Sequence, residues 1–332
     1  MSQGNFFAIG ADEFSKACEL GLRPAVALLV LACGTQKDNS TTSWSAQAVF
    51  NHTGMAWRRA IDAIDELVKA DLVSVIKTGK KPRYKLSKPT DMDSFIWLPR
   101  EIIEGAGNET PPVRRLRERG NALLLQKFIE LYSVHDLTAD GGLPRTLVRI
   151  DYERVVIGPC GVFVMYGFKN KATTATSIGP LKSLNGIEDD DKNKGAWVVL
   201  NPLYQMGLLE IVTYMAESSD YESELLYQVN DETYEAMIQL SCYLDQGGGQ
   251  GFSRSLEAHL PTAGLAVRDL KDATMIGVFR LRYRPKTAKT TVWYATEQAQ
   301  TERFVAGVQK LCGLDVDIKG FQGYSKEING YQ

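Results

Sequence analysis

The stretch from Ser45 to Ala70 constrains the fold of this chain more than any other part of its sequence. Residues 45–51 predict a short helix. Residues 56–70 predict a longer one, whose apolar side chains recur at three- and four-residue intervals. Gly54 lies between the two patterns, and glycine accepts the positive φ that a tight turn often needs. The sequence therefore predicts two helices joined by a tight turn.

A basic hairpin is expected directly after these helices. Residues 73–76 and 83–86 predict two strands, with a loop at residues 78–82. The bases of this stretch, which contains no acid, are Lys77, Lys80, Lys81, Arg83, Lys85 and Lys88. The net charge of the whole chain is only −2, but a local cluster of this kind can still attract phosphate.

Two further helices are expected upstream, at residues 11–20 and 25–32, and the second is apolar enough to be largely buried. This order of helices, turn and basic hairpin resembles the winged helix-turn-helix family found among bacterial transcription regulators and plasmid replication initiators. The matching stretches are Ser45–Gly54, Arg58–Ile61 and Leu67–Val73. The resemblance covers about the first quarter of the chain. It departs from many relatives at Ala70 and Asp71, where they place a glycine.

The resemblance implies that the helix after the turn enters the major groove and contacts base edges near its N-terminus. The candidates for base or phosphate contacts there are Thr53, Met55, Ala56, Trp57, Arg58 and Arg59. Arginine can form two hydrogen bonds to guanine. Because adjacent helix residues point about 100° apart, Arg58 and Arg59 cannot reach the same base, and we expect one of them to hold a phosphate. The alternative interpretations are solvated arginines and, for Trp57, a packing role.

The preceding helix and the hairpin would contact the DNA backbone. Ser45 and Gln47 lie where the preceding helix would cross the phosphates, and neutral donors there position a protein without reading sequence. The wing candidates, which would lie along phosphates or in the minor groove, are Lys77, Lys80, Lys81, Arg83 and Lys85. A lysine-rich tip that only improves solubility is the alternative.

A second basic surface is expected at Arg280, Arg282 and Arg284. These residues alternate within a predicted strand at 275–284, and alternate strand residues share one face. A strand at 291–296 would complete a hairpin. The row of arginines would form a second DNA contact, or it would carry charges that protect an edge strand from aggregation.

The length of 332 residues predicts two or three domains, and the mixture of helical and strand patterns predicts an α+β fold. We expect a winged helix-turn-helix domain at 1–90, a second α+β domain at 91–230 and a C-terminal α+β region at 231–332. Within the second domain, a helix beginning at Asn201 and Pro202 precedes strands at 208–215 and 225–229. This order repeats that of the first domain, so the second is interpreted as winged-helix-like or, alternatively, as an unrelated α+β fold.

Acidic residues dominate positions 185–235, where twelve carboxylates are accompanied by two lysines. Such a region repels phosphate, so we expect it to contact protein. The simplest partner is a second copy of the chain, since regulators of this type are commonly two-fold dimers that read paired half-sites.

Signatures of other functional classes are missing from the sequence. It contains no GxxxxGK[ST] motif, and its three histidines lack metal-ligand spacing. We therefore expect no enzyme activity, no cofactor and no metal. The longest apolar stretch, Ala25–Cys33, is shorter than a membrane span, and the first residues do not resemble a signal peptide. The five cysteines form no CxxC pair, which favours a cytoplasmic location.

These features predict a sequence-specific protein that binds double-stranded DNA, and transcription regulation is the first expectation. A plasmid or phage replication initiator with two winged-helix domains is the second. It would place Arg280, Arg282 and Arg284 on the same side as the first wing. The third is a protein-interaction component of a mobile element or defence system, for which the wing would be dispensable.

Overall fold

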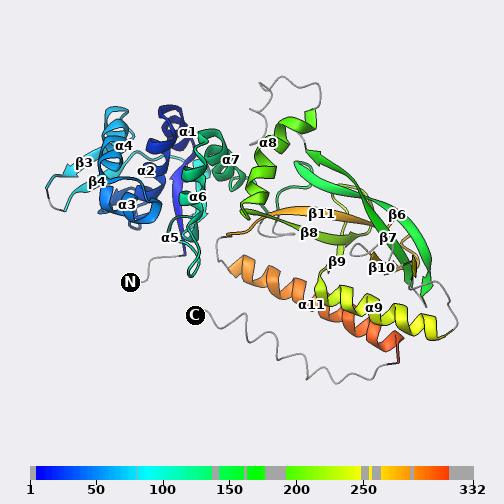
Figure 1. Cartoon of the computed structure of the whole chain (residues 1–332). Coiled ribbons are helices and arrows are strands. Elements are labelled where there is room, and N and C mark those ends of the chain that lie inside the picture. The colour runs from blue at the N-terminus through cyan, green and yellow to red at the C-terminus, as the bar shows by residue number, and fades with distance from the viewer. Residues whose placement is uncertain are drawn as a thin grey trace. The chain divides into compact units, whose positions relative to one another are not determined.

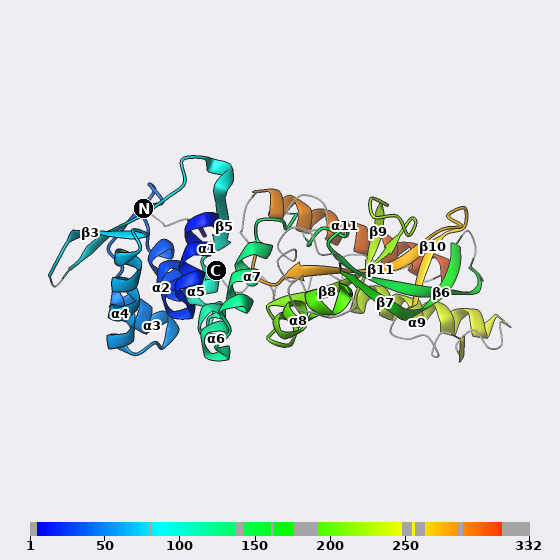
Figure 2. The same ribbon diagram turned by 90° about the horizontal axis from the view of Figure 1, so that it is seen from above.

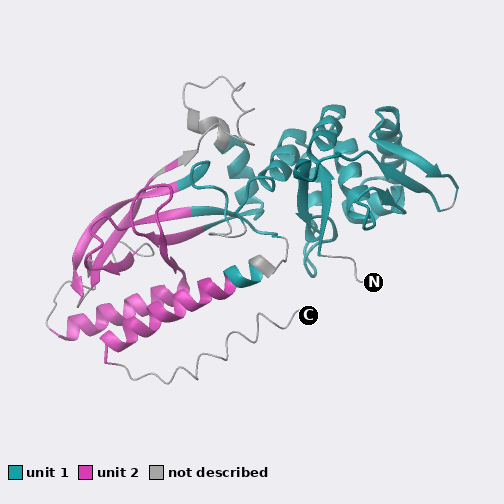
Figure 3. Cartoon of the chain, turned by 180° about the vertical axis from the view of Figure 1, so that it is seen from behind, with its two compact units in different colours: residues 1–149, 174–211, 278–293 teal, residues 150–173, 212–277, 294–332 magenta. Residues whose placement is uncertain are grey.

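The computed structural model describes residues 5–79, 81–136, 142–160, 163–175, 192–247, 254–255, 263–284 and 288–313. It contains both helices and strands, which confirms the α+β class (Figure 1). The chain divides into two compact units, each assembled from separate stretches of sequence (Figure 3). The first unit comprises residues 1–149, 174–211 and 278–293, and the second comprises 150–173, 212–277 and 294–332.

The first 131 residues hold most of the helices of the first unit. Their elements are β1 (Phe6–Gly10), α1 (Ala11–Leu20), α2 (Leu22–Cys33), β2 (Thr41–Thr42), α3 (Ala46–Thr53), α4 (Trp57–Lys69), β3 (Val73–Lys77), β4 (Arg83–Leu86), a 3₁₀ turn (Met92–Ser94), β5 (Phe95–Pro99), α5 (Glu101–Glu104), α6 (Pro112–Arg119) and α7 (Ala122–Leu131). The helices and strands expected between residues 11 and 86 are confirmed to within a few residues.

Helix α2 is the centre of this part of the fold. Every residue from Pro24 to Cys33 is buried, and α1, α3, α4 and α6 all pack against the helix. Burying one leucine or valine side chain contributes about 1.5–3 kcal/mol. The continuous apolar run therefore explains why four neighbouring helices and the strand β1 assemble around it.

The N-terminal strand extends this part of the fold beyond residue 90. β1 pairs antiparallel with β5, so that Phe6 lies opposite Pro99 and Gly10 lies opposite Phe95. Arg100 follows β5 and donates a hydrogen bond from Nη1 to the carbonyl oxygen of Cys33, at the end of α2, over 2.8 Å. The structure thus differs from the expected division at residue 90, because strand pairing joins residues from the two sides of that boundary.

The transition from α4 to β3 contains a non-glycine residue in the left-handed region. Asp71 has a φ of 57°. Aspartate tolerates this conformation better than most residues because its short polar side chain can hydrogen-bond locally. The chain therefore makes this turn into β3 without a glycine.

The remaining elements are β6 (Val148–Cys160), β7 (Phe163–Ala175), α8 (Lys192–Gln205), β8 (Leu209–Ala216), β9 (Leu225–Val229), α9 (Asp231–Gln246), β10 (Ala263–Val267), β11 (Thr274–Leu281) and α11 (Ala288–Leu311). The strands form one six-stranded sheet in the order β10-β7-β6-β11-β8-β9. The β8–β9 hairpin was expected, but β8 also neighbours β11. The hairpin is therefore part of a large sheet, which differs from the separate second winged-helix-like domain considered above.

Helices α9 and α11 cover the sheet in the second unit (Figure 1). Met237 and Leu240 of α9 and Val308 of α11 form one apolar cluster with Met165 and Leu265 of the strands. The sheet residues of this cluster belong to β6, β7 and β10, which are consecutive in the sheet. The core of the second unit thus lies between this end of the sheet and the two helices.

Two expectations for the C-terminal half were wrong. Residues 291–296 were expected to form a strand but belong to α11, whose buried residues Thr290, Trp293 and Thr301 recur at helical intervals. Burial of this face outweighs the strand preference of β-branched residues. Pro202 was expected to start a helix but lies inside α8, near its end. Proline there removes one helical hydrogen bond and crowds the carbonyl one turn earlier, and burial of the neighbouring Val199, Leu200 and Leu203 offsets that cost.

The lowered pKa values of two histidines predict that the stability of the protein depends on pH. Burial lowers the pKa of His52 and of His135 below the ordinary value of 6.5. The unfolded chain therefore binds protons at a higher pH than the folded chain does, so stability is lost as pH falls from 6.5 through the lowered values. We expect urea denaturation to give a lower free energy of unfolding at about pH 5.5 than at about pH 7.5. The difference should shrink in a variant carrying His52→Gln and His135→Gln. An equal difference in the variant would contradict this assignment.

Candidate nucleic-acid interface

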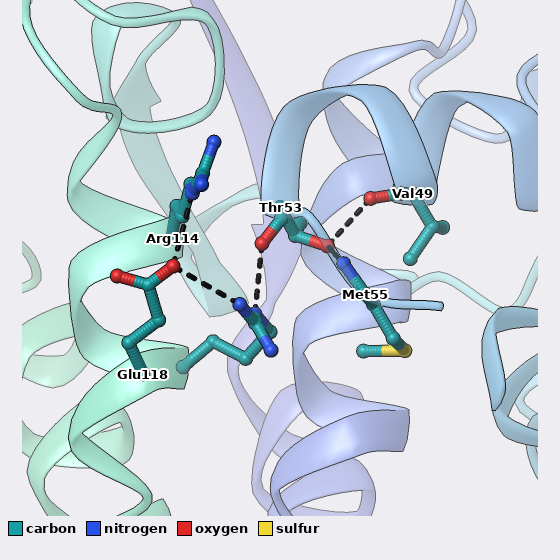
Figure 4. Close-up of polar contacts among 6 residues, drawn as sticks. Val49, Thr53, Met55, Arg114 and Glu118 are labelled. Carbon is teal, nitrogen blue, oxygen red and sulfur yellow. Dashed lines mark hydrogen bonds and ion pairs between the residues drawn. The ribbon is translucent and has the colours of Figure 1, made fainter. Parts of the chain in front are cut away.

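The turn between α3 and α4 is held by one buried hydroxyl group (Figure 4). Thr53 Oγ1 donates a hydrogen bond to the carbonyl oxygen of Val49 over 2.5 Å and accepts one from the backbone N–H of Met55 over 3.1 Å. Gly54 then takes a φ of 67°, as the sequence predicted. Thr53 is completely buried and Met55 nearly so. The expectation that their side chains contact DNA is therefore corrected, because both support the turn from inside.

The first turn of α4 is exposed and positively charged. Trp57 has 46% of its surface exposed, and Arg58 and Arg59 are exposed beside it. No described residue forms a hydrogen bond or ion pair with either arginine. The N-cap residue, Ala56, has no side chain that could accept from the first amides of the helix. Cations at a helix N-terminus are unfavourable by a few tenths of a kcal/mol to about 1 kcal/mol, so this end of α4 would be stabilised by an anion.

Helix α3 presents a mostly neutral surface. Ser45 occupies the N-cap position but its side chain forms no capping hydrogen bond, contrary to what its residue type suggests. Gln47 is exposed, and its side-chain amide donates to Asn51 Oδ1 over 2.7 Å. Both predicted backbone-positioning residues thus lie where solvent or a ligand can reach them, on the helix that precedes the α3–α4 turn.

The three-stranded sheet β2-β4-β3 has one apolar face, which is buried at its base, and one basic face. Val73 of β3 pairs with Leu86 of β4, and both are buried. A β-bulge between Val75 and Lys77 then shifts the register by one residue, so that Lys77 lies opposite Arg83. Without the bulge, strict alternation would place Lys77 on the same face as Val73.

The bulge gathers the basic residues of the hairpin on the other face. Lys77, Arg83 and Lys85 share it, and all three are exposed. Lys81 is exposed in the connecting turn, whereas Lys80 lies outside the described residues. Like charges directly opposite each other destabilise a strand pair, so an anion bound between Lys77 and Arg83 would relieve a repulsion that the register creates. Figure 2 shows the hairpin projecting beyond the helices that precede it.

The second basic surface expected from the sequence is not formed. Arg280 is 3% exposed and its guanidinium group lies 4.4 Å from the ring centroid of Trp293, which also faces Arg284. Arg282 follows the end of β11 and forms an ion pair with Glu109 over 2.6 Å. The prediction of a phosphate-binding ridge is corrected, because α11 contributes the tryptophan that covers this side of the strand.

Sequence reasoning missed two arginines that the structure brings to the α3–α4 turn. Helix α6 packs against α3, and Arg117 donates from Nε to the carbonyl oxygen of Thr53 over 2.8 Å. Arg114 lies beside it, and both bind Glu118 (Figure 4). The run of arginines in residues 114–119 is visible in the sequence. Nothing local, however, indicates which helix end it approaches.

Comparison with protein-family models, curated proteins and solved structures finds no match to this chain. Within the part of the chain that the structure describes, no group of three histidine, cysteine, aspartate or glutamate side chains could hold a metal ion. No helix among the same residues is both long and apolar enough to span a membrane.

Proposed function

We propose that residues 10–90 form a winged helix-turn-helix domain that binds double-stranded DNA. Helix α4 would enter the major groove, α3 would cross the backbone, and the β3–β4 hairpin would act as the wing. The order of α3, a tight turn, α4 and a small sheet supports this proposal, as does the presence of exposed bases at both expected contact points.

The register of the wing is the observation that carries the proposal. A single β-bulge places Lys77 with Arg83 and Lys85 on the exposed face, at the cost of opposing two like charges. A hairpin whose basic residues served only solubility would not need these charges on one face. A row of cations along one face, by contrast, suits the phosphates of a DNA strand.

The two arginines of α4, Arg58 and Arg59, have different roles in this proposal. Because they point about 100° apart, one is directed toward base edges in the groove and the other toward a phosphate. The first amides of α4, which have no side-chain cap, offer a further phosphate contact. A domain of this kind reads sequence without catalysing a reaction, and regulation of transcription by a dimer on paired half-sites is the use we propose for it.

The first experiment is recovery of genomic fragments by the purified full-length protein, from DNA of its own source, at about 0.05 M and about 0.2 M salt. We expect one or a few sites, retained at the higher salt and built as inverted repeats. Uniform recovery that disappears at the higher salt would refute sequence-specific binding. Sites within promoters would support regulation, whereas a single site in a replication origin would contradict it.

Separate Arg58→Ala and Arg59→Ala variants test the division of roles on α4. Replacement of the arginine that reads a base should lower the affinity for the recovered site by about 5- to 150-fold and relax the sequence preference at one position. Replacement of the other arginine should lower the affinity for all sequences equally and reduce the slope of log affinity against log salt by about one. A Lys16→Ala, Arg23→Ala variant removes two exposed cations of α1 and α2 as a control. Unchanged binding in both α4 variants would overturn the proposed recognition helix.

A further inference from the structure

Helix α6 brings two guanidinium groups to the turn that leads into the proposed recognition helix. A Cβ atom on Gly54 would lie 3.4 Å from Nε of Arg114 and 3.6 Å from Nη2 of Arg117. Gly54 precedes α4 by only three residues. Both arginines therefore lie beside the turn that leads into the end of α4 that has no side-chain cap. Figure 4 shows Arg114 on the α6 side of this turn.

The two arginines have different tasks, as their hydrogen bonds show. Arg117 has 24% of its side chain exposed and uses Nε to bind the carbonyl oxygen of Thr53, one of the groups left without a helical partner at the end of α3. Arg114 has 47% of its side chain exposed and binds only Glu118, through Nε. Its two Nη groups donate to none of the described residues.

The charges of this cluster do not cancel. The single carboxylate, Glu118, accepts hydrogen bonds from Arg114 over 3.0 Å and from Arg117 over 3.2 Å. One positive charge is left over, and it adds to the positive end of the α4 dipole. A guanidinium group with its Nη edge free presents a planar fork that matches phosphate oxygens.

We propose that Arg114 is a third DNA-backbone contact, beside α4 and the wing, and that it binds a phosphate of the strand passing the α3–α4 turn. Arg117 is a positioning residue that fixes the turn through Thr53. This inference rests on the proposed function, because it assigns one more contact to the same duplex. It extends the interface to residue 114, outside the segment that resembles the winged-helix family.

The test compares Arg114→Ala with Arg119→Ala in the full-length protein, on a DNA site recovered as above. Arg119 is exposed on the same helix but points about 140° away from Arg114, so both variants lose the same charge. Loss of one phosphate contact should reduce the salt slope by about one and the affinity by about five-fold at about 0.15 M salt. The Arg119→Ala variant should bind like the original chain. Thermal unfolding verifies that each variant is folded.

A Glu118→Gln variant tests the same contact by an expected gain in affinity instead of a loss. It removes the carboxylate that competes with DNA for Arg114 but keeps an acceptor oxygen, so we expect tighter binding by a few-fold. Adding Arg114→Ala to it should abolish the gain.

Two results would overturn the contact at Arg114. One is an unchanged salt slope in Arg114→Ala while the α4 variants lose affinity, which leaves the proposed function standing. The other is an equal loss in Arg114→Ala and Arg119→Ala, which would indicate long-range charge alone. Unchanged binding in the Arg114, α4 and wing variants together would instead remove the proposed function itself.

Discussion

A double variant with Lys77→Ala and Arg83→Ala is expected to bind its DNA site about 25-fold more weakly than the original chain at about 0.15 M salt. The two residues lie opposite each other beside the β-bulge of the β3–β4 hairpin, the proposed wing. If each holds one phosphate, each contributes about five-fold at this salt, and the slope of log affinity against log salt should fall by about two. Titration of a labelled duplex at four or more salt concentrations measures both quantities.

The control for the wing is the Lys16→Ala, Arg23→Ala variant, which removes the same number of charges from α1 and α2. It should change affinity by less than about two-fold, since neither residue belongs to the α3–α4 turn, to α4 or to the hairpin and salt weakens interactions between exposed charges that are not in contact. The double wing variant should also be at least as stable as the original chain, because it relieves a repulsion between like charges. A wing variant that binds like this control would show that the hairpin serves solubility instead.

Replacement of Thr53 by valine is expected to lower the free energy of unfolding by about 2–3 kcal/mol. Valine has nearly the shape of threonine but can neither donate to the Val49 carbonyl nor accept from the N–H of Met55. Both backbone groups lie in the buried turn between α3 and α4, where water cannot replace the lost partner at no cost. Chemical denaturation followed by circular dichroism measures the change.

Thr53→Ser is the matched variant for this turn. It keeps the hydroxyl group and removes one methyl, so we expect it to lose about 1 kcal/mol or less. Affinity for the DNA duplex should be unchanged in Thr53→Ser and reduced in Thr53→Val. This result would show that the hydrogen bonds of the turn position α4 for binding. Equal losses of stability in the two variants would show that packing of the methyl, rather than the two hydrogen bonds, holds the turn.

Local patterns were sufficient for the helices α1 to α4 and for the β3–β4 hairpin, but not for the short strand β2. The apolar residues of α4 recur at helical spacing, Gly54 permits the left-handed conformation of the turn, and β3 and β4 are short strands around a polar loop. Each of these features depends on residues within about one or two turns of the chain, which is the range that periodicity and turn chemistry describe. The exposed positions of Arg58 and Arg59 follow from the same periodicity.

The sequence by itself therefore determined the α+β class, the order of helices, turn and basic hairpin, and the residues that carry the charge. Only the tertiary structure decided which of these charged residues are exposed and which of them share one surface. Burial of Thr53, coverage of Arg280 by Trp293 and the approach of Arg114 to the turn all depend on contacts between residues far apart in the chain. The β-bulge that aligns Lys77 with Arg83 is likewise a property of strand pairing. No local pattern specifies these contacts, because they form only when the buried faces of distant elements meet.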